Sequence, residues 1–204
     1  MTKKQSQFVD YVKSECKKHG VICDLRPVSY LKLRDNIRCS GYFDDNDNIR
    51  PRLVVAMKKK DWLEILVHEY CHMTQWLDQK SGKFLKWNSS IKSILVVDDW
   101  LSGQKVNNIK RHMAAVRDLE LDNEKRSVRM IKLCDLDIDL DNYIRKANAY
   151  ILFYNHMLIT RKWSTPKNNP YRNARILSAM STSFKMNYKS TSKKVKQLFL
   201  EEKI

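Results

Sequence analysis

His68, Glu69 and His72 have the side-chain types and the spacing of a metal-dependent site, in the pattern HExxH. On an α-helix, positions i and i+4 lie on one face, so the two imidazoles can bind one tetrahedral metal ion. Glu69 lies beside them, where its carboxylate can take a proton from a water at the metal. The alternative interpretation is a helix with two surface or core histidines and a glutamate that share no role.

The segment that carries these residues is predicted to be an amphipathic helix. Apolar side chains recur at helical spacing over residues 61–78, with Asp61 as a candidate N-cap and residues 81–82, Ser-Gly, as the end of the helix. Cys71, inside the motif, is expected to be a small buried residue. A candidate strand, residues 53–57, leads into this helix. That context favours the metal-site interpretation.

A catalytic zinc usually takes three protein ligands and keeps a fourth position for water, so the motif needs a third ligand. Asp78 lies ten residues after His68. A ligand there requires the chain to turn back sharply at a position that Gln75 occupies inside a good helix. His112 is a second candidate, although a single histidine on a basic helix is more commonly a surface residue. The sequence therefore favours a third candidate further along the chain.

That candidate is Glu120, which is followed one helical turn later by Glu124 on the long helix predicted for residues 106–133. One carboxylate can bind the metal, and the second can accept a hydrogen bond from a ligand histidine and so orient the imidazole. The alternative is a charged solvated face with i, i+4 salt bridges, for instance from Asp122 to Arg126. Because the upstream motif lacks a third ligand, the ligand interpretation is preferred.

The HEYCH motif and the Glu-x-x-x-Glu pair that begins 48 residues after its second histidine resemble the gluzincin arm of the zincin-like metallopeptidases. This resemblance implies that His68, His72 and Glu120 are zinc ligands. It also implies that Glu69 is the general base and that Glu124 supports a ligand histidine. One Zn²⁺ per chain and a peptide or protein substrate follow as expectations.

A second likeness covers most of the chain. The stretches LVHEYCHMTQW, LELDNEKRSV, ANAYILFYN and RKWS are similar to uncharacterised zincin-like proteins of large tailed phages. These proteins bring no established substrate, but they imply a phage origin and a location in the host cytoplasm or the virion. The basic SprT-like proteases also carry HExxH, with a third histidine soon after it. This chain departs from them, because it has Ser-Gly-Lys-Phe at residues 81–84.

A peptidase site also uses a hydrogen-bond donor that stabilises the tetrahedral oxyanion. Tyr143, Tyr150 and Tyr154 recur at spacings of seven and four on a helix predicted for residues 141–161, which also carries His156. Tyr150 and Tyr154 are the candidates for this catalytic role. The alternative is an aromatic stripe that belongs to the core, which is the more common origin of such a pattern.

The net charge of +16 arises from 39 Lys and Arg against 23 Asp and Glu, and it attracts polyanions without specifying one. From Arg161 to the end, 11 Lys and Arg face 2 Glu, which places +9 of the +16 in this basic segment. Such a segment can contact nucleic acid or an acidic protein, or can serve only as a solubilising surface. No known nucleic-acid-reading motif accompanies it.

The remaining features predict one soluble α+β domain over residues 1–204. The 43% of apolar residues can form a core, and five irregularly spaced cysteines exclude a disulfide framework. The polar N-terminus has no secretory signal, and the most apolar stretch, residues 149–159, is too short to span a membrane. These features predict a cytoplasmic protein without a membrane partner.

The order of elements is β-rich early and α-rich late, which is typical of α+β proteins. A small sheet from the first 60 residues is expected to pack on the motif helix, with the long acidic helix crossing it and the site between the two parts. Residues 44–48 form a predicted hairpin turn, and Pro51 indicates a strand that begins irregularly or lies at an edge. The other predicted elements are strands at 21–25 and 37–43 and helices at 3–19, 91–101, 171–180 and 192–202.

Two functions fit these patterns. The leading one is a zinc metallopeptidase that activates water for peptide-bond hydrolysis. The alternative is a non-enzymatic binding protein with a structural or vestigial metal, whose basic segment docks on nucleic acid or an acidic partner. The intact Glu69 favours the enzyme, because a vestigial site has no need of the base. The ligand set suits zinc and can also hold iron with open positions.

Overall fold

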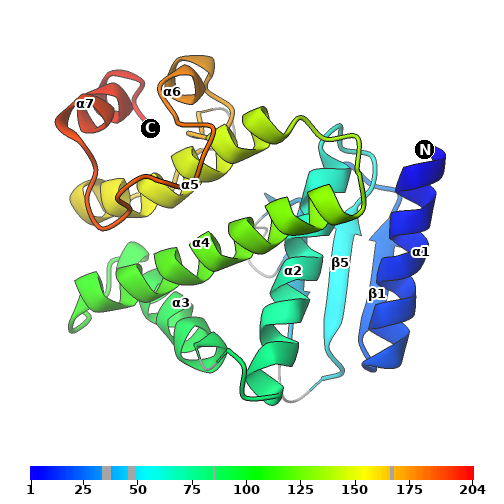
Figure 1. Cartoon of the computed structure of the whole chain (residues 1–204). Coiled ribbons are helices and arrows are strands. Elements are labelled where there is room, and N and C mark those ends of the chain that lie inside the picture. The colour runs from blue at the N-terminus through cyan, green and yellow to red at the C-terminus, as the bar shows by residue number, and fades with distance from the viewer. Residues whose placement is uncertain (34–37, 46–48, 85, 166–167) are drawn as a thin grey trace. The chain divides into compact units, whose positions relative to one another are not determined.

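The structure is a computed structural model that describes the chain except for residues 34–37, 46–48, 85 and 166–167. The described residues form seven helices and a small mixed sheet, which confirms the α+β class (Figure 1). The chain divides into two compact units that are interleaved in sequence. The sheet unit comprises Met1–Phe84 and Arg126–Ile138, and the helical unit comprises Leu85–Lys125 and Asp139–Ile204. A single zincin-like domain stays a prediction.

The sheet has the order β1-β5-β4, with β1 (Ile22–Arg26) parallel and β4 (Gly41–Asp44) antiparallel to β5 (Arg52–Ala56). Residues 53–56 of β5 are all buried, as expected for a central strand covered on both faces. The antiparallel β4–β5 pair confirms the predicted hairpin, part of whose turn lies outside the described residues. Pro51 does not mark an edge strand. It immediately precedes the central strand, where its missing N–H removes no bond from the ladder.

The two faces of the sheet are covered by different elements. Helix α2 (Trp62–Lys80) packs on β4 and β5, and α1 (Lys3–Lys18) packs on β1. The two helices also contact each other, where the Tyr70 hydroxyl donates to the Tyr11 hydroxyl at 2.9 Å. Side chains alternate along a strand, and Val54 and Ala56 cluster with Leu31 of a small antiparallel ladder. This ladder, β2 (Leu31–Lys32) with β3 (Arg38–Cys39), extends the strand pattern predicted from the sequence.

Local sequence signals explain where the helices of the sheet unit begin and end. Thr2 and Gln5 form a capping box that starts α1. Gly20, just past the end of α1, has φ +71°, a conformation that favours glycine. Asp61 occupies the N-cap position of α2 but makes no side-chain capping bond, so only the position of this cap was predicted correctly.

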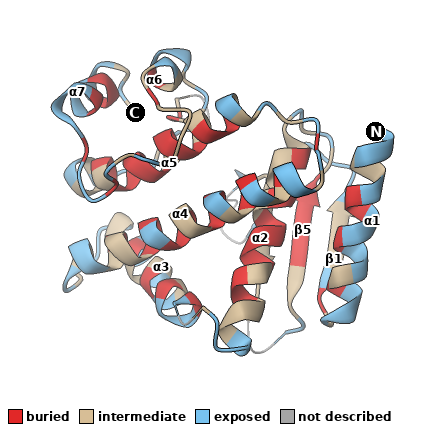
Figure 2. Ribbon diagram, viewed as in Figure 1, coloured by how far each residue is buried: buried red, intermediate tan, exposed pale blue. Residues whose placement is uncertain are grey.

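The helical unit is organised around α5 (Leu140–Thr160), the helix predicted for residues 141–161. One apolar cluster joins α5 to α3 (Trp87–Leu101) and α4 (Ile109–Leu133), and includes Phe153 and Met157. Another joins α5 to α6 (Ala174–Ser178) and α7 (Lys193–Glu201). Figure 2 shows the resulting band of buried residues along α5. None of the described helices is long and apolar enough to cross a membrane.

Helix α4 is continuous but contributes to both units, because its residues from Arg126 onward belong to the sheet unit. In the sheet unit, the Arg126 Nη1 atom lies 2.6 Å from Asp78 Oδ2 and donates to Thr74 Oγ1 at 3.3 Å. Asp78 and Thr74 both lie on α2. The C-terminal part of the long acidic helix is therefore held against the helix that carries the HExxH motif.

Candidate metal centre

The two histidines of the motif converge on one point. His68 and His72 lie one turn apart on α2, and their Nε2 atoms are 3.1 Å apart. The ring planes are nearly perpendicular, at 85°. Two imidazole nitrogens that bind one tetrahedral zinc at about 2.0–2.1 Å are about 3.3 Å apart. The observed separation therefore fits two ligands of a single ion.

Gln75 orients the second histidine. The Nδ1 atom of His72 lies 2.9 Å from Gln75 Oε1, and the Gln75 side chain is fully buried. An amide oxygen only accepts hydrogen bonds, so the bond places the imidazole proton on Nδ1 and leaves the Nε2 lone pair for a metal. From the sequence, Gln75 served only as evidence against a sharp turn before Asp78. A polar residue three positions after the second histidine, on the same helix face, was the signal for this role.

Glu69 lies where strand β4 passes closest to α2. A Cβ atom at Gly41 would lie 3.0 Å from Glu69 Cγ and 2.6 Å from Ile65 Cγ2, so only glycine fits there without a shift of its neighbours. Burial, together with the negative charge of Glu69, raises the pKa of the Cys39 thiol to about 11. The general-base candidate is thus buried beside the edge strand of the sheet.

The other candidate ligands have different partners. Asp78 forms an ion pair with Arg126, which the sequence had offered as a partner of Asp122. In the helical unit, His112 Nδ1 lies 3.1 Å from Ser93 Oγ. Cys71 is buried, as predicted, with 1% of its surface exposed.

Glu120 and Glu124 lie one turn apart on α4, in the part that belongs to the helical unit. Both are buried, with 7% and 6% of their surfaces exposed. A buried pair of carboxylates differs from the alternative of a solvated charged face. Burial of a carboxylate requires compensation by hydrogen bonds, a cation or a metal, so the two carboxylates do not form a solvated face.

Tyr150 and Tyr154 lie near Glu120 within the helical unit. Their hydroxyl oxygens are 2.8 Å apart, and the ring of Tyr171 lies 5.9 Å from that of Tyr150. Burial raises the pKa of Tyr150 and Tyr154 most, and the Glu120 carboxylate raises both further. Both phenols therefore stay protonated and can donate hydrogen bonds. Tyr154 also belongs to the apolar cluster of the unit, so the core interpretation of the aromatic stripe holds for this ring as well.

Tyr171 is the member of this cluster that was not predicted from the sequence. It lies in a loop rich in Asn and Pro, where no helical period links it to Tyr150. Tyr143, which shares their predicted face, is buried near the start of α5.

Comparison with protein-family models, with curated proteins and with solved structures finds no match to this chain. The resemblance to zincin-like proteins therefore stays a prediction. His68, Glu69 and His72 lie together in the sheet unit, and Glu120, Tyr150 and Tyr154 lie together in the helical unit.

Proposed function

We propose that this chain is a zinc-dependent metallopeptidase in which His68, His72 and Glu120 bind one Zn²⁺. The observation that carries the proposal is the convergence of the two Nε2 atoms at 3.1 Å, with the His72 proton held on Nδ1 by Gln75. The proposed ligands are two imidazoles of the sheet unit and one carboxylate of the helical unit, side chains of the types that could hold a metal ion. Two imidazole nitrogens and one carboxylate oxygen are a common ligand set of catalytic zinc and leave a fourth position open.

The continuity of α4 supports Glu120 as the third ligand. Arg126 is bonded to Thr74, which follows His72 by two residues on α2. A helix rises 1.5 Å per residue, so Glu120 lies about 9 Å from Arg126 along the axis of α4. We therefore propose that the turns of α4 before Arg126 supply the third ligand. Glu124, one turn from Glu120, would accept a hydrogen bond from a ligand histidine.

The protein's own groups fit the steps of peptide hydrolysis. A bound zinc ion would lower the pKa of a bound water and polarise the scissile carbonyl. Glu69 would accept the proton of the attacking water and pass it to the leaving amine. Tyr150 and Tyr154, which stay protonated, would donate hydrogen bonds to the oxyanion that develops.

Cleavage of a peptide library by the zinc-loaded chain, with Glu69→Gln as the key variant, tests this proposal. We expect Glu69→Gln to lower kcat by at least about 100-fold while the zinc content stays unchanged, because the base but no ligand is lost. Glu64→Gln is the matched control, since it makes the same chemical change on the same helix outside the motif. Equal cleavage by Glu69→Gln and wild type would overturn the mechanism. Stable zinc binding without cleavage of any peptide would instead favour the non-enzymatic binding protein.

A further inference from the structure

The basic C-terminal segment is folded onto the helical unit and is not a loose tail. In α7, Val195, Leu198 and Phe199 are buried, and the ring of Phe199 lies 6.5 Å from that of Phe153 on α5. The last carbonyl of the chain, of Ile204, lies 3.2 Å from His156 Nε2. The backbone that carries the charged residues of this segment is therefore held in a defined conformation.

The loop between α6 and α7 is held in the same way. The Tyr188 hydroxyl donates to Asn148 Oδ1, and Asn148 Nδ2 donates to the Ser181 carbonyl at 2.7 Å. Asn155 Nδ2 donates to the Tyr188 carbonyl at 3.0 Å. Two asparagines of α5 thus fix the loop that carries Lys185 and Lys189, both exposed.

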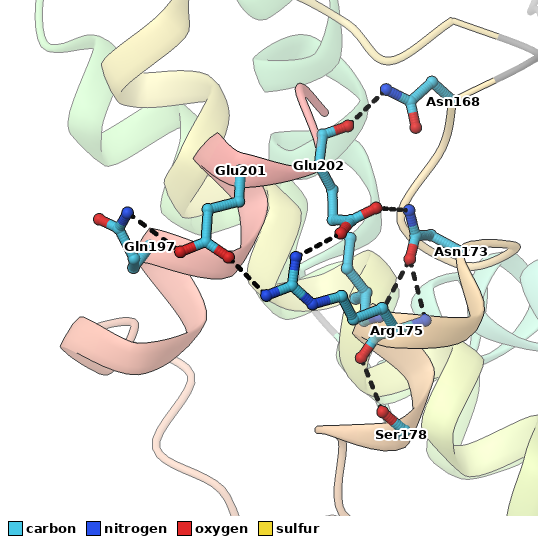
Figure 3. Close-up of polar contacts among 8 residues, drawn as sticks. Asn168, Asn173, Arg175, Ser178, Gln197, Glu201 and Glu202 are labelled. Carbon is cyan, nitrogen blue, oxygen red and sulfur yellow. Dashed lines mark hydrogen bonds and ion pairs between the residues drawn. The ribbon is translucent and has the colours of Figure 1, made fainter.

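Both carboxylate side chains of the segment are bound to one arginine, as Figure 3 shows. Arg175 lies 2.6 Å from Glu201 and 2.8 Å from Glu202, and Asn173 Nδ2 donates to Glu202 at 2.7 Å. These bonds join α6 to α7, so the carboxylates neutralise Arg175 and not the lysines.

The lysines of the segment that the structure describes have no acidic partner. Within the part of the chain that the structure describes, every one of them is exposed and none is in an ion pair. They are Lys162, Lys185, Lys189, Lys193, Lys194, Lys196 and Lys203. An array of fixed, uncompensated ammonium groups favours a polyanionic partner.

The apolar groups of the segment indicate which polyanion fits. A helix that binds a lipid surface needs an exposed apolar face, but the apolar face of α7 is buried. Trp163 is 49% exposed and follows Lys162. Its ring packs edge-on, 5.9 Å away, against the same Phe153 ring that contacts α7. An exposed indole beside lysines is a stacking surface for an unpaired base.

We propose that the helical unit binds single-stranded nucleic acid. The lysines of α7 and of the loop before it contact the phosphates, and Trp163 stacks on a base. This activity is independent of the proposed metal site, and it would bring the chain to nucleic acid or to proteins bound there.

The experiment measures the fluorescence anisotropy of a labelled oligonucleotide of about 20 nucleotides, single-stranded or as a duplex, between about 50 and 200 mM salt. The key variant is Lys193→Glu/Lys194→Glu/Lys196→Glu. The matched control, Lys3→Glu/Lys13→Glu/Lys17→Glu on α1, changes the net charge equally at exposed lysines of another helix. Glutamates in the first turn of α7 suit the helix dipole, so the fold of the key variant should persist.

We expect the α7 variant to bind the single strand at least about tenfold more weakly than the control does. Its slope of log K against log salt should be smaller by about 2, for three lost phosphate contacts. Trp163→Leu should weaken single-strand binding by about fivefold or more. Equal losses in the two triple variants would overturn the proposal, as would a duplex that binds as tightly as the single strand.

Discussion

The Nδ1 atom of His72 lies 2.9 Å from Oε1 of Gln75, a buried amide three residues later on α2. This bond selects the tautomer in which Nε2 carries the lone pair that a metal would bind. It also fixes the ring plane, so that Nε2 meets the Nε2 of His68 at 3.1 Å. The candidate ligand His72 is thus oriented by a residue outside the HExxH motif.

Replacing Gln75 tests this orientation. We expect Gln75→Leu to weaken zinc binding by about 10- to 100-fold, because His72 loses the acceptor that fixes its proton, whereas Gln75→Glu keeps an acceptor and retains binding. Competition with a chromophoric chelator measures both affinities. Gln79→Leu, one turn further along the same helix, is the control. An unchanged affinity in Gln75→Leu would show that Gln75 does not position the ligand.

Gly41 is expected to be intolerant of any side chain. Gly41→Ala should lower the free energy of unfolding by about 1–3 kcal/mol, because its Cβ would clash with Ile65 Cγ2 on α2. Gly41→Ala/Ile65→Ala should be more stable than the sum of the two single changes predicts, since the clashing methyl is gone. Urea unfolding of the four proteins gives this coupling, and strict additivity would refute the close contact.

Arg126 is expected to hold the end of α4 on α2. Arg126→Met should lower the free energy of unfolding by about 1–3 kcal/mol, because Asp78 and Thr74 lose a partly buried donor. It should also weaken zinc binding if Glu120 depends on this anchor. Lys125→Met, at the exposed neighbouring position, is the control for both measurements. A variant as stable as the control would show that the ion pair with Asp78 contributes nothing.

Tyr188 is expected to make the stability of the helical unit depend on pH in the alkaline range. Burial raises the pKa of its hydroxyl to about 12, above the ordinary value of about 10. A raised pKa means that the folded state binds the proton more tightly. The contribution of the protonated Tyr188 hydroxyl to the free energy of unfolding is therefore complete below pH 10 and is lost as the pH rises through 12. The stability of Tyr188→Phe should fall less steeply than that of wild type above pH 10 in urea unfolding, and parallel curves would contradict this.

Much of the secondary structure could be predicted from local patterns. The helical period, Gly20 and the Asp-Asn turn give elements close to those observed, because these signals act over a few residues. The position of β5 in the middle of the sheet could not be predicted, because the pairing of β1 with β5 joins segments about 30 residues apart. The two-residue strands β2 and β3 are too short for a period to show.

For the candidate site, too, local patterns could be predicted and long-range contacts could not. His68, Glu69 and His72 could be found because their chemistry depends on helical spacing alone. Gln75 was visible in the same pattern but was not interpreted. Tyr171 could not be found, because only the folded helical unit brings its loop to Tyr150.

The most direct test of the metal centre is the zinc content of protein purified without a metal-affinity tag, measured by mass spectrometry. We predict about one zinc per chain in the wild type and its loss in both His72→Ala and Glu120→Ala, because each change removes one of three ligands. Glu64→Ala, outside the ligand set, should keep the metal. A wild-type protein that holds no zinc even after zinc is added, or a Glu120→Ala variant that binds zinc as tightly as wild type, would contradict the proposed site.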